Sequence, residues 1–528
     1  MNLRRMIADN VKMNALSVLF AGNIQPEAFE KVFDNKNAFM LTLEKAASFK
    51  ESKKILILAA ETFNEEYILG SNIEQIKIVR HKEWNVINLI ETIVQESTGF
   101  DIVYFAHADC PFLDKNITES MINRHIEYSA DYSYADGFPQ GLAPEILQPA
   151  TFVFLAKIAA CDTSSVMRDT IFSVLQKDIN SFDIETEISP VDLRAYRLSL
   201  CADSKRNLLL LKRFWEEKFS SADDAEKIIT TKPELLRTLP AFYPIQVVSA
   251  CPQKCRICPY PAITESIENC NEYMTCGNFD ALLNKIIDFS GDAVIDLSMW
   301  GEISLHPQKK DLIQAVLDKR ALSLIIETSG IGWKESELIE IAAIAKNAAA
   351  RKNNMSPLSI IVSLDAIEEA EYQRVRGANF NEAFNCAKKI AEIFGSNAYI
   401  QAVRFKGNEI SIEKFYRYWN ELKVNIIIQK YDSFCNRKED LRAADLSPIN
   451  RLPCVHNMRD FPVLLDGRVI QCREDLRSLE TKNETLGNVF NEDLKNIWQR
   501  AQALYGEHCA GNYQNLCKEC DEYWTFNF

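Results

Sequence analysis

Three cysteines in one short stretch are the residues of this chain best suited to chemistry. Cys251, Cys255 and Cys258 stand at C-x3-C-x2-C spacing. The β-branched, apolar run 245–250 directly before them predicts a buried strand, so the cysteines should lie on the loop that leaves its carboxyl end. Three thiolates this close cannot all pair as disulfides, and a closed zinc site needs four ligands. They can instead hold three irons of a 4Fe–4S cube and leave the fourth iron open to a second molecule.

This cysteine pattern after a first barrel strand resembles the radical S-adenosylmethionine (SAM) superfamily. The resemblance implies that SAM chelates the open iron through its amino and carboxylate groups. An electron from the reduced cluster then cleaves SAM to a 5′-deoxyadenosyl radical. One difference is visible, because Ile257 stands where the family usually has an aromatic residue. The alternative is a zinc knuckle that borrows a ligand such as His306 or Cys276.

The elements that must position this triad follow a regular alternation from Leu239 to about Arg437. Six strand-like runs alternate with helix-like segments, which predicts parallel strands joined by right-handed crossovers. Six units are too few for an eight-stranded barrel, but they fit the partial (β/α)6 barrel that the resemblance implies. Active sites of such barrels lie at the carboxyl ends of the strands. The strand-like runs begin near Ile245, Val294, Leu322, Leu358, Ala398 and Val424.

Polar residues follow these runs in the order in which radical SAM enzymes use them to bind SAM. The resemblance implies that Gly301 and Glu302 lie near the SAM amino group. It also implies that Ser363 and Asp365 face the methionyl or ribosyl part of SAM. One of two arginines in a single short stretch is expected to pair with the SAM carboxylate. The candidate cofactor-binding residues are Gly301, Glu302, Thr328, Ser363, Asp365, Arg374 and Arg376.

The last ninety or so residues carry a second group of cysteines. Asp466-Gly467 predicts the tight turn of a hairpin, which would bring the first two cysteines together. A zinc ribbon is the plain interpretation of such a pattern. After a radical SAM barrel, however, C-x(n)-G-x4-C followed by C-x2-C resembles a SPASM or shortened "twitch" domain. That resemblance implies a single auxiliary 4Fe–4S cluster held by four thiolates, with Cys509 as the one extra cysteine nearby. The implied ligands are Cys454, Cys472, Cys517 and Cys520.

The first 235 residues alternate strand and helix patterns, which predicts an open α/β sheet. Asp109 follows a strand-like run, at a position where ligands and metals bind in such sheets; the alternative is a helix cap. The stretch resembles the metal-binding segment of sugar nucleotidyltransferases with a glycosyltransferase-A-type fold, which makes Asp109 a possible nucleotide or Mg²⁺ site. Residues 136–145 and 193–203 resemble further stretches of polysaccharide cytidylyltransferases. The glycine-rich, Arg-containing phosphate loop of those enzymes is missing, since residues 21–26 hold one glycine and no basic residue.

Composition excludes several classes of protein. Of the 528 residues, 47% are hydrophobic and 25% charged, and the net charge is −14. The negative charge disfavours nucleic-acid binding, which needs a basic surface. No apolar run is long enough to span a membrane. Arg4 and Arg5 are followed by charged residues rather than by an apolar segment, so we expect no signal peptide and a cytoplasmic location. In that compartment the 15 cysteines serve metal binding or packing rather than disulfides.

Along its whole length the chain resembles the spiro-SPASM protein family. We expect an α/β protein with a nucleotidyltransferase-like domain (1–235), a radical SAM partial barrel (239–437) and a SPASM/twitch domain (438–528). The implied function is a radical SAM oxidoreductase or modifying enzyme that abstracts hydrogen from a peptide or protein. The alternatives are oxidation of a small sugar or nucleotide-linked substrate, and a bifunctional protein with nucleotidyltransferase activity. The implied cofactors are two 4Fe–4S clusters and SAM, with flavodoxin or ferredoxin as electron donor.

Overall fold

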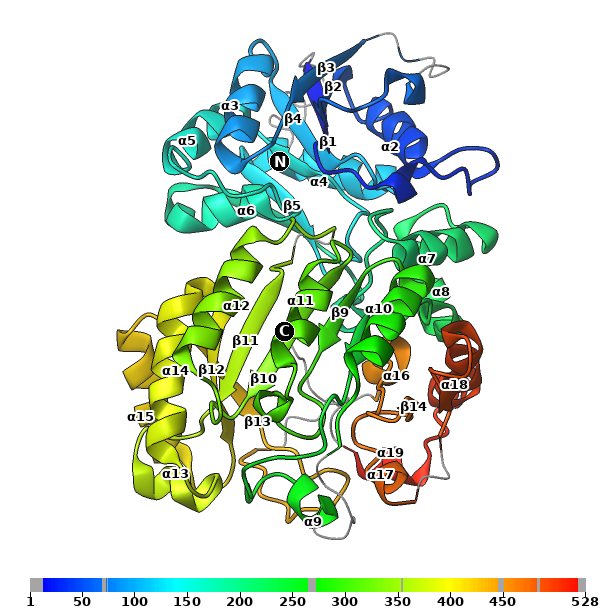
Figure 1. Cartoon of the computed structure of the whole chain (residues 1–528). Helices are drawn as coiled ribbons and strands as arrows, with labels where there is room; N and C mark the ends of the chain where they lie inside the picture. The colour runs from blue at the N-terminus through cyan, green and yellow to red at the C-terminus, as the bar shows by residue number, and fades with distance from the viewer. Residues whose placement is uncertain are drawn as a thin grey trace. The chain divides into compact units, whose positions relative to one another are not determined.

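The computed structural model divides the chain into two compact units, Met1–Leu235 and Leu236–Phe528 (Figure 1). It describes residues 13–68, 73, 75–264, 272–352, 355–444, 451–481 and 485–520. Arg4 and Arg5, on which the expectation about a signal peptide rests, lie outside these residues. Within the described ranges, no helix combines the length and apolar character needed to cross a membrane.

The first unit is built on a mixed sheet in which the described strands follow the order β3-β2-β1-β4-β6-β5-β7. The four strands β1 to β4 are parallel to one another, as the alternating pattern predicts. Strand β6 runs antiparallel to both β4 and β5, which the pattern did not indicate. The strands are β1 Ala15–Ala21, β2 Ser52–Ala60, β3 Ile76–His81, β4 Ile102–His107, β5 Tyr132–Asp136, β6 Glu145–Leu147 and β7 Ile184–Ile188.

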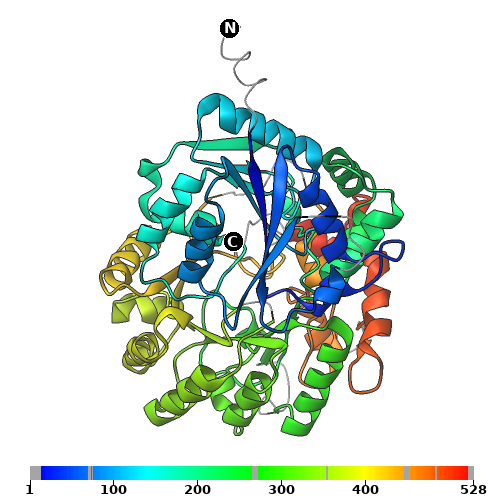
Figure 2. The ribbon, with the colours of Figure 1, turned by 90° about the horizontal axis from the view of Figure 1, so that it is seen from above.

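Helices cover both faces of this sheet (Figure 2). Alternate residues of a strand point to opposite faces, so Val18 and Phe20 pack with α3 and α5 in one hydrophobic cluster. Ser17 lies on the other face, where its hydroxyl donates to the carbonyl of Ala46 in α2. The helices are α2 Ala38–Ala47, α3 Val86–Glu96, α4 Lys115–Tyr128, α5 Pro149–Ile158, α6 Thr170–Leu175, α7 Lys205–Glu216 and α8 Ala222–Thr231.

The second unit contains a parallel sheet whose described strands follow the order β13-β12-β11-β10-β9-β8. This order follows the chain without interruption, as expected of the partial (β/α)6 barrel. The first strand is shorter and earlier than predicted, because residues 246–250 leave the ladder and bond to other segments; Gln246 N, for example, donates to Val463 O at 2.9 Å. The strands are β8 Phe242–Pro244, β9 Ala293–Asp296, β10 Leu322–Thr328, β11 Leu358–Ser363, β12 Ala398–Arg404 and β13 Asn425–Lys430.

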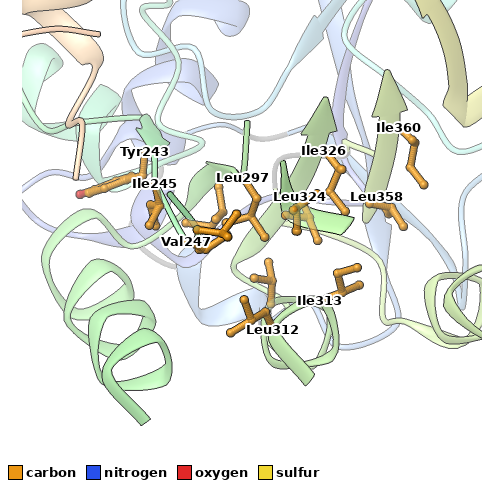
Figure 3. Close-up of a cluster of buried hydrophobic side chains, with 14 of the residues drawn as sticks. Tyr243, Ile245, Val247, Leu297, Leu312, Ile313, Leu324, Ile326, Leu358 and Ile360 are labelled. Atoms are coloured by element: carbon orange, nitrogen blue, oxygen red, sulfur yellow. The ribbon is translucent and has the colours of Figure 1, made fainter. Parts of the chain in front are cut away.

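The core of the second unit lies between this sheet and its helices. Figure 3 shows Leu312 and Ile313 of α11 pointing toward Leu324 and Leu297 of the strand layer. Helix ends follow local sequence signals, since the Thr275 hydroxyl caps α10 and Gly291, with φ of +83°, follows its last residue. The helices of the barrel region are α9 Tyr260–Thr264, α10 Cys276–Ser290, α11 Lys309–Leu317, α12 Glu335–Asn347, α13 Glu369–Val375, α14 Phe380–Phe394 and α15 Glu409–Glu421.

The cysteine-rich C-terminal segment shares this core instead of building its own. Val463, Ile497 and Trp498 belong to the same cluster of buried side chains as the barrel strands. A segment with strands of only two residues cannot bury enough apolar surface alone. The expected turn is present, because Gly467 has a φ of +83° and Val463 pairs with Val469 across it. The elements are β14 Arg468–Val469, β15 Gly487–Asn488, α16 Val455–Arg459, α17 Arg477–Thr481, α18 Leu494–Cys509 and α19 Asn515–Glu519.

Candidate functional site

A cavity of about 310 Å³ lies at the carboxyl ends of the barrel strands. Every strand of the second sheet contributes to its lining, as barrel active sites require. Side chains along a strand alternate between its two faces. On β10, Leu324 and Ile326 pack toward the helices, so Glu327 lies on the barrel's interior face. The lining residues that lie on the strands are Pro244, Asp296, Glu327, Thr328, Ser363, Gln401, Val403, Gln429 and Lys430.

The three cysteines of the first motif line this cavity together. Two backbone hydrogen bonds order the loop that carries them. Within the loop, Cys258 N donates to Cys255 O at 3.2 Å, and Arg256 N donates to Val375 O of α13 at 2.8 Å. Burial, followed by the nearby Cys255, raises the pKa of Cys258 to about 12. A thiol of this kind must lose its proton when it binds a metal.

The donor set fits an iron–sulfur cube better than zinc. The described residues that line the cavity include no histidine and no cysteine beyond the triad, so a structural zinc site of four cysteine or histidine ligands lacks its fourth donor. His306 does not supply it, because its Nε2 donates to Met274 O at 2.9 Å and its Nδ1 accepts from Gln308 N. Cys276 begins α10 and does not line the cavity. Three thiols with an open fourth position are what a SAM-binding cluster needs.

The loop after β9 lies directly against the cysteine-bearing segment. Gly301 has a φ of +111°, and a Cβ there would stand 2.0 Å from the carbonyl oxygen of Val248, so only glycine fits. Glu302 N donates to Ala250 O at 2.8 Å. The carboxylate of Glu302 accepts from the Thr328 hydroxyl at 2.6 Å and from Ser329 N at 2.7 Å. Glu302 and Thr328 both line the cavity, and the hydrogen bond between their side chains holds the loop after β9 against the end of β10.

The two candidate arginines have different surroundings. Arg376 lines the cavity, and its guanidinium lies 2.5 Å from a carboxylate oxygen of Asp365 and 3.9 Å from the sulfur of Cys255. Arg374 pairs with Glu371 and is not part of the lining. Asp365 does not line the cavity either, because one of its oxygens holds Arg376 and the other accepts from Val403 N. Of the two arginines, Arg376 is therefore the one that lines the cavity, and Asp365 holds its guanidinium in place.

Several cavity residues were not singled out from the sequence. Glu327 accepts hydrogen bonds from the Ser363 hydroxyl and from the Gln401 amide, the latter at 2.7 Å. Asp296, at the end of β9, also lines the cavity, and burial followed by the charge of Glu327 raises its pKa to about 7. Arg473, next to the second motif, lines the same cavity. The sequence could have identified Asp296 and Glu327, because each lies near the carboxyl end of a strand and follows an apolar residue that faces the helices.

The cysteines of the C-terminal motif gather around a second, smaller cavity. Cys454, Cys472, Cys517 and Cys520 all line it. Burial first, then the neighbouring Cys520, raises the pKa of Cys517 to about 11. The four thiols match the donor set of a closed 4Fe–4S cube. Cys509 is not part of the lining among the described residues.

Cys435 joins the same four cysteines, which the sequence did not predict. It lines the second cavity, and its thiol is hydrogen-bonded to that of Cys520. Cys435 lies well before Cys454 in the sequence and belongs to no cysteine motif. No cysteine spacing pointed to it.

The first unit places Asp109 in an internal ion-pair network. Arg168 donates to both carboxylate oxygens of Asp109, at 3.1 and 2.5 Å, and to Asp203 at 2.9 Å. Burial raises the pKa of Asp109, but the adjacent Arg168 outweighs it and leaves the pKa below its usual value. The thiols of Cys110 and Cys201 lie 3.6 Å apart beside this network. A guanidinium therefore occupies the position beside Asp109, where the nucleotidyltransferase resemblance implies a possible Mg²⁺ site.

The loop after β1 is also unlike a phosphate cradle. A Cβ on Gly22 would stand 2.4 Å from the Trp84 ring and 2.6 Å from the Phe20 ring. The glycine thus permits tight aromatic packing. Asn23 donates its side-chain amide to Val166 O. None of the described residues 21–26 is basic, so the loop offers no cationic side chain to a triphosphate.

Known proteins match this chain over different lengths. Residues 454–521 match the SPASM model of an iron–sulfur cluster-binding domain. An uncharacterized protein of Treponema pallidum (strain Nichols) is 37% identical over 370 residues, which cover 68% of this chain and 98% of that protein. The spore coat polysaccharide biosynthesis protein SpsF of Bacillus subtilis (strain 168) is 20% identical over 191 residues, or 36% of this chain and 78% of that protein.

Among solved structures, Streptococcus suis SuiB bound to its precursor peptide SuiA is similar at 15% identity and a TM-score of 0.41, over 68% of this chain and 79% of that one. At 37% identity over 98% of the treponemal protein, the chain belongs to the same family as that protein, and it carries a SPASM iron–sulfur cluster-binding domain after a parallel barrel sheet whose cavity is lined by the cysteine triad.

Proposed function

We propose that this protein is a radical SAM enzyme that abstracts a hydrogen atom from a peptide or protein side chain at the mouth of the barrel. The observation that carries the proposal is the single cavity that joins the cysteine triad to the strand-end polar residues. Cys251, Cys255 and Cys258 would hold the SAM-binding cluster, which together with SAM supplies a 5′-deoxyadenosyl radical when bound. The second cluster would be held by Cys454, Cys472, Cys517 and Cys520.

The chain's own residues would bind and orient SAM. Arg376 carries a fixed positive charge beside Cys255 and suits the SAM carboxylate. Asp365 keeps that guanidinium in place, and its own burial makes the pair rigid. Gly301 lets the loop after β9 approach the cysteine segment, while Glu302 and Thr328 hold this loop against the next strand. These residues thus prepare the site before any ligand arrives.

The size of the cavity supports a side-chain-sized reacting group. About 310 Å³ lies at the low end of the range of small-molecule sites, and SAM must share this space with the substrate. A larger substrate therefore has to insert one group and leave the rest outside. Asp296, whose pKa is raised to about 7, can hold or release a proton near neutral pH beside that group. A peptide side chain fits these conditions.

A second candidate is a sugar or nucleotide-linked substrate, which the similarity of the first unit to a polysaccharide biosynthesis protein favours. The first unit would then bind and present the substrate. We do not assign it nucleotidyl transfer, because Arg168 already bridges Asp109 and Asp203 and because the Gly22 loop has no basic residue. Such transfer needs a triphosphate held by donors and a carboxylate-bound Mg²⁺.

Isotope transfer into 5′-deoxyadenosine distinguishes the two substrate classes. Cells grown in deuterated medium would provide a peptide fraction and a nucleotide-sugar fraction, each incubated anaerobically with reconstituted protein, SAM and dithionite. We expect deuterium in 5′-deoxyadenosine from the peptide fraction, and none with Cys255→Ala. Deuterium from the nucleotide-sugar fraction alone would replace the peptide proposal with the second candidate.

A further inference from the structure

A fifth cysteine lies beside the four thiols of the C-terminal motif. Cys435 lines the same cavity as these four cysteines, and its side chain is in hydrogen-bond contact with that of Cys520. A closed 4Fe–4S cube uses four thiolates. The site therefore contains one sulfur more than a closed cluster needs, and the role of the additional thiol requires an explanation.

Two observations identify Cys520, rather than Cys435, as the cluster ligand. It interacts electrostatically with Cys454, Cys472 and Cys517 as well as with Cys435. Among the sulfurs, that of Cys520 acts most strongly on Cys435, followed by that of Cys472. The matched iron–sulfur domain, residues 454–521, also includes Cys520 and leaves Cys435 outside. Cys435 is thus placed at the edge of the thiol cluster, against one of its ligands.

The backbone holds Cys435 there in an uncommon conformation. Phe434, Cys435 and Asn436 have φ of 50°, 54° and 63°, three consecutive non-glycine residues in the left-handed region. Such strain persists only where the surroundings enforce it, and it concentrates at functional sites. Here Phe434 N donates to the Asp432 carboxylate at 2.7 Å, and the Asn436 amide donates to Glu519 of α19. The loop is therefore fastened on both sides of Cys435.

The same loop reaches the SAM cavity. Phe434 lines that cavity, and its ring lies 5.8 Å from the ring of Trp300, the residue before Gly301. Adjacent residues of one strained loop thus border the two proposed cluster sites. A change of charge at the thiol cluster acts next to residues that shape the SAM cavity.

Building on the proposed function, we infer that Cys435 is a further residue of the auxiliary iron–sulfur site, where its thiol donates a hydrogen bond to the sulfur of Cys520. Hydrogen bonds to ligand sulfurs are among the factors that set the reduction potential of such clusters. A donor draws electron density from the thiolate and favours the reduced, more negative cluster. Cys435 therefore positions and tunes the cluster without ligating it, and its removal lowers the reduction potential.

The test uses the full chain in a Cys255→Ala background, in which the first cluster is lost and signals come from the C-terminal cluster alone. Cys435→Ala and Cys435→Ser are added separately, with Cys161→Ala as a control that removes an exposed thiol of the first unit. Each protein is reconstituted anaerobically, its iron is counted, and the cluster is titrated by electron paramagnetic resonance. We expect about four irons per chain throughout. The potential should be more negative in Cys435→Ala and partly restored in Cys435→Ser, whose hydroxyl still donates.

Two results would overturn the inference. Iron loss in Cys435→Ala as complete as in Cys454→Ala would make Cys435 a ligand. A potential equal to that of the parent would show that its thiol has no effect on the cluster. Absence of C-terminal iron from the parent itself would refute the proposed auxiliary cluster, a different failure that is visible before any Cys435 variant is compared.

Discussion

Arg376 offers a prediction in which stability and SAM binding can be separated. Its guanidinium is 2.5 Å from Asp365, and the side chains are 12% and 0% exposed. Arg376→Ala leaves a buried carboxylate without its cation, which costs about 3–5 kcal/mol of unfolding free energy. It also removes a charge-assisted hydrogen bond to the SAM carboxylate, worth about 1.5–3 kcal/mol. The second loss corresponds to SAM binding weaker by about tenfold to about a hundredfold.

The double variant Arg376→Ala/Asp365→Asn separates the two effects. An amide at position 365 keeps the acceptor for Val403 N but carries no charge, so most of the lost stability should return. SAM affinity should stay low, because no cation faces the carboxylate. Denaturant unfolding measures the first quantity, and calorimetric titration of anaerobic protein with SAM measures the second.

Arg374→Ala is the matched control, since its ion pair with Glu371 is on the surface and worth about 0–1 kcal/mol. Its SAM affinity should equal that of the wild type. Recovery of SAM affinity in the double variant, or weak binding in Arg374→Ala with normal binding in Arg376→Ala, would refute this assignment.

Three further predictions concern separate sites. Cys255→Ala should abolish SAM cleavage and halve the bound iron, while loss of all iron would show that the two clusters do not form independently. Asp109→Asn should leave SAM cleavage unchanged, and the full chain should release no pyrophosphate from nucleoside triphosphates; Mg²⁺-dependent release that disappears in Asp109→Asn would make the protein bifunctional. Asp296 has a folded pKa of about 7, above its unfolded value of 3.8, so the folded state binds the extra proton and stability falls as pH rises between them. Relative to the wild type, Asp296→Asn should gain up to about 4 kcal/mol of stability between the bottom and the top of this window, and an equal difference at both ends in denaturant unfolding would contradict it.

The barrel sheet was largely predictable because it depends on local period and order. Alternating strands and helices determine a parallel sheet, and the residue type at each strand end determines what lines the cavity. The alternation of side chains between the two faces of a strand would also have identified Asp296 and Glu327, since their neighbours Ile295 and Ile326 pack toward the helices.

Contacts that join distant segments were not predictable in this way. Arg168 reaches Asp109 from a loop between two helices 59 residues away, and no spacing rule relates them. Arg374 and Arg376 stand in one stretch, but two residues apart near the end of a helix they point in different directions. Cys435 reaches the thiol cluster because of three left-handed residues, a conformation that non-glycine residues rarely announce in sequence.

The central claim is that the triad of Cys251, Cys255 and Cys258 supports reductive cleavage of SAM. The most direct measurement is the amount of 5′-deoxyadenosine and methionine that anaerobically reconstituted protein forms from SAM under dithionite, together with its metal content. We predict formation of both products by protein that holds about eight irons in two cubes, and none by Cys255→Ala. Tightly bound zinc, with no incorporation of iron and no cleavage, would contradict the account.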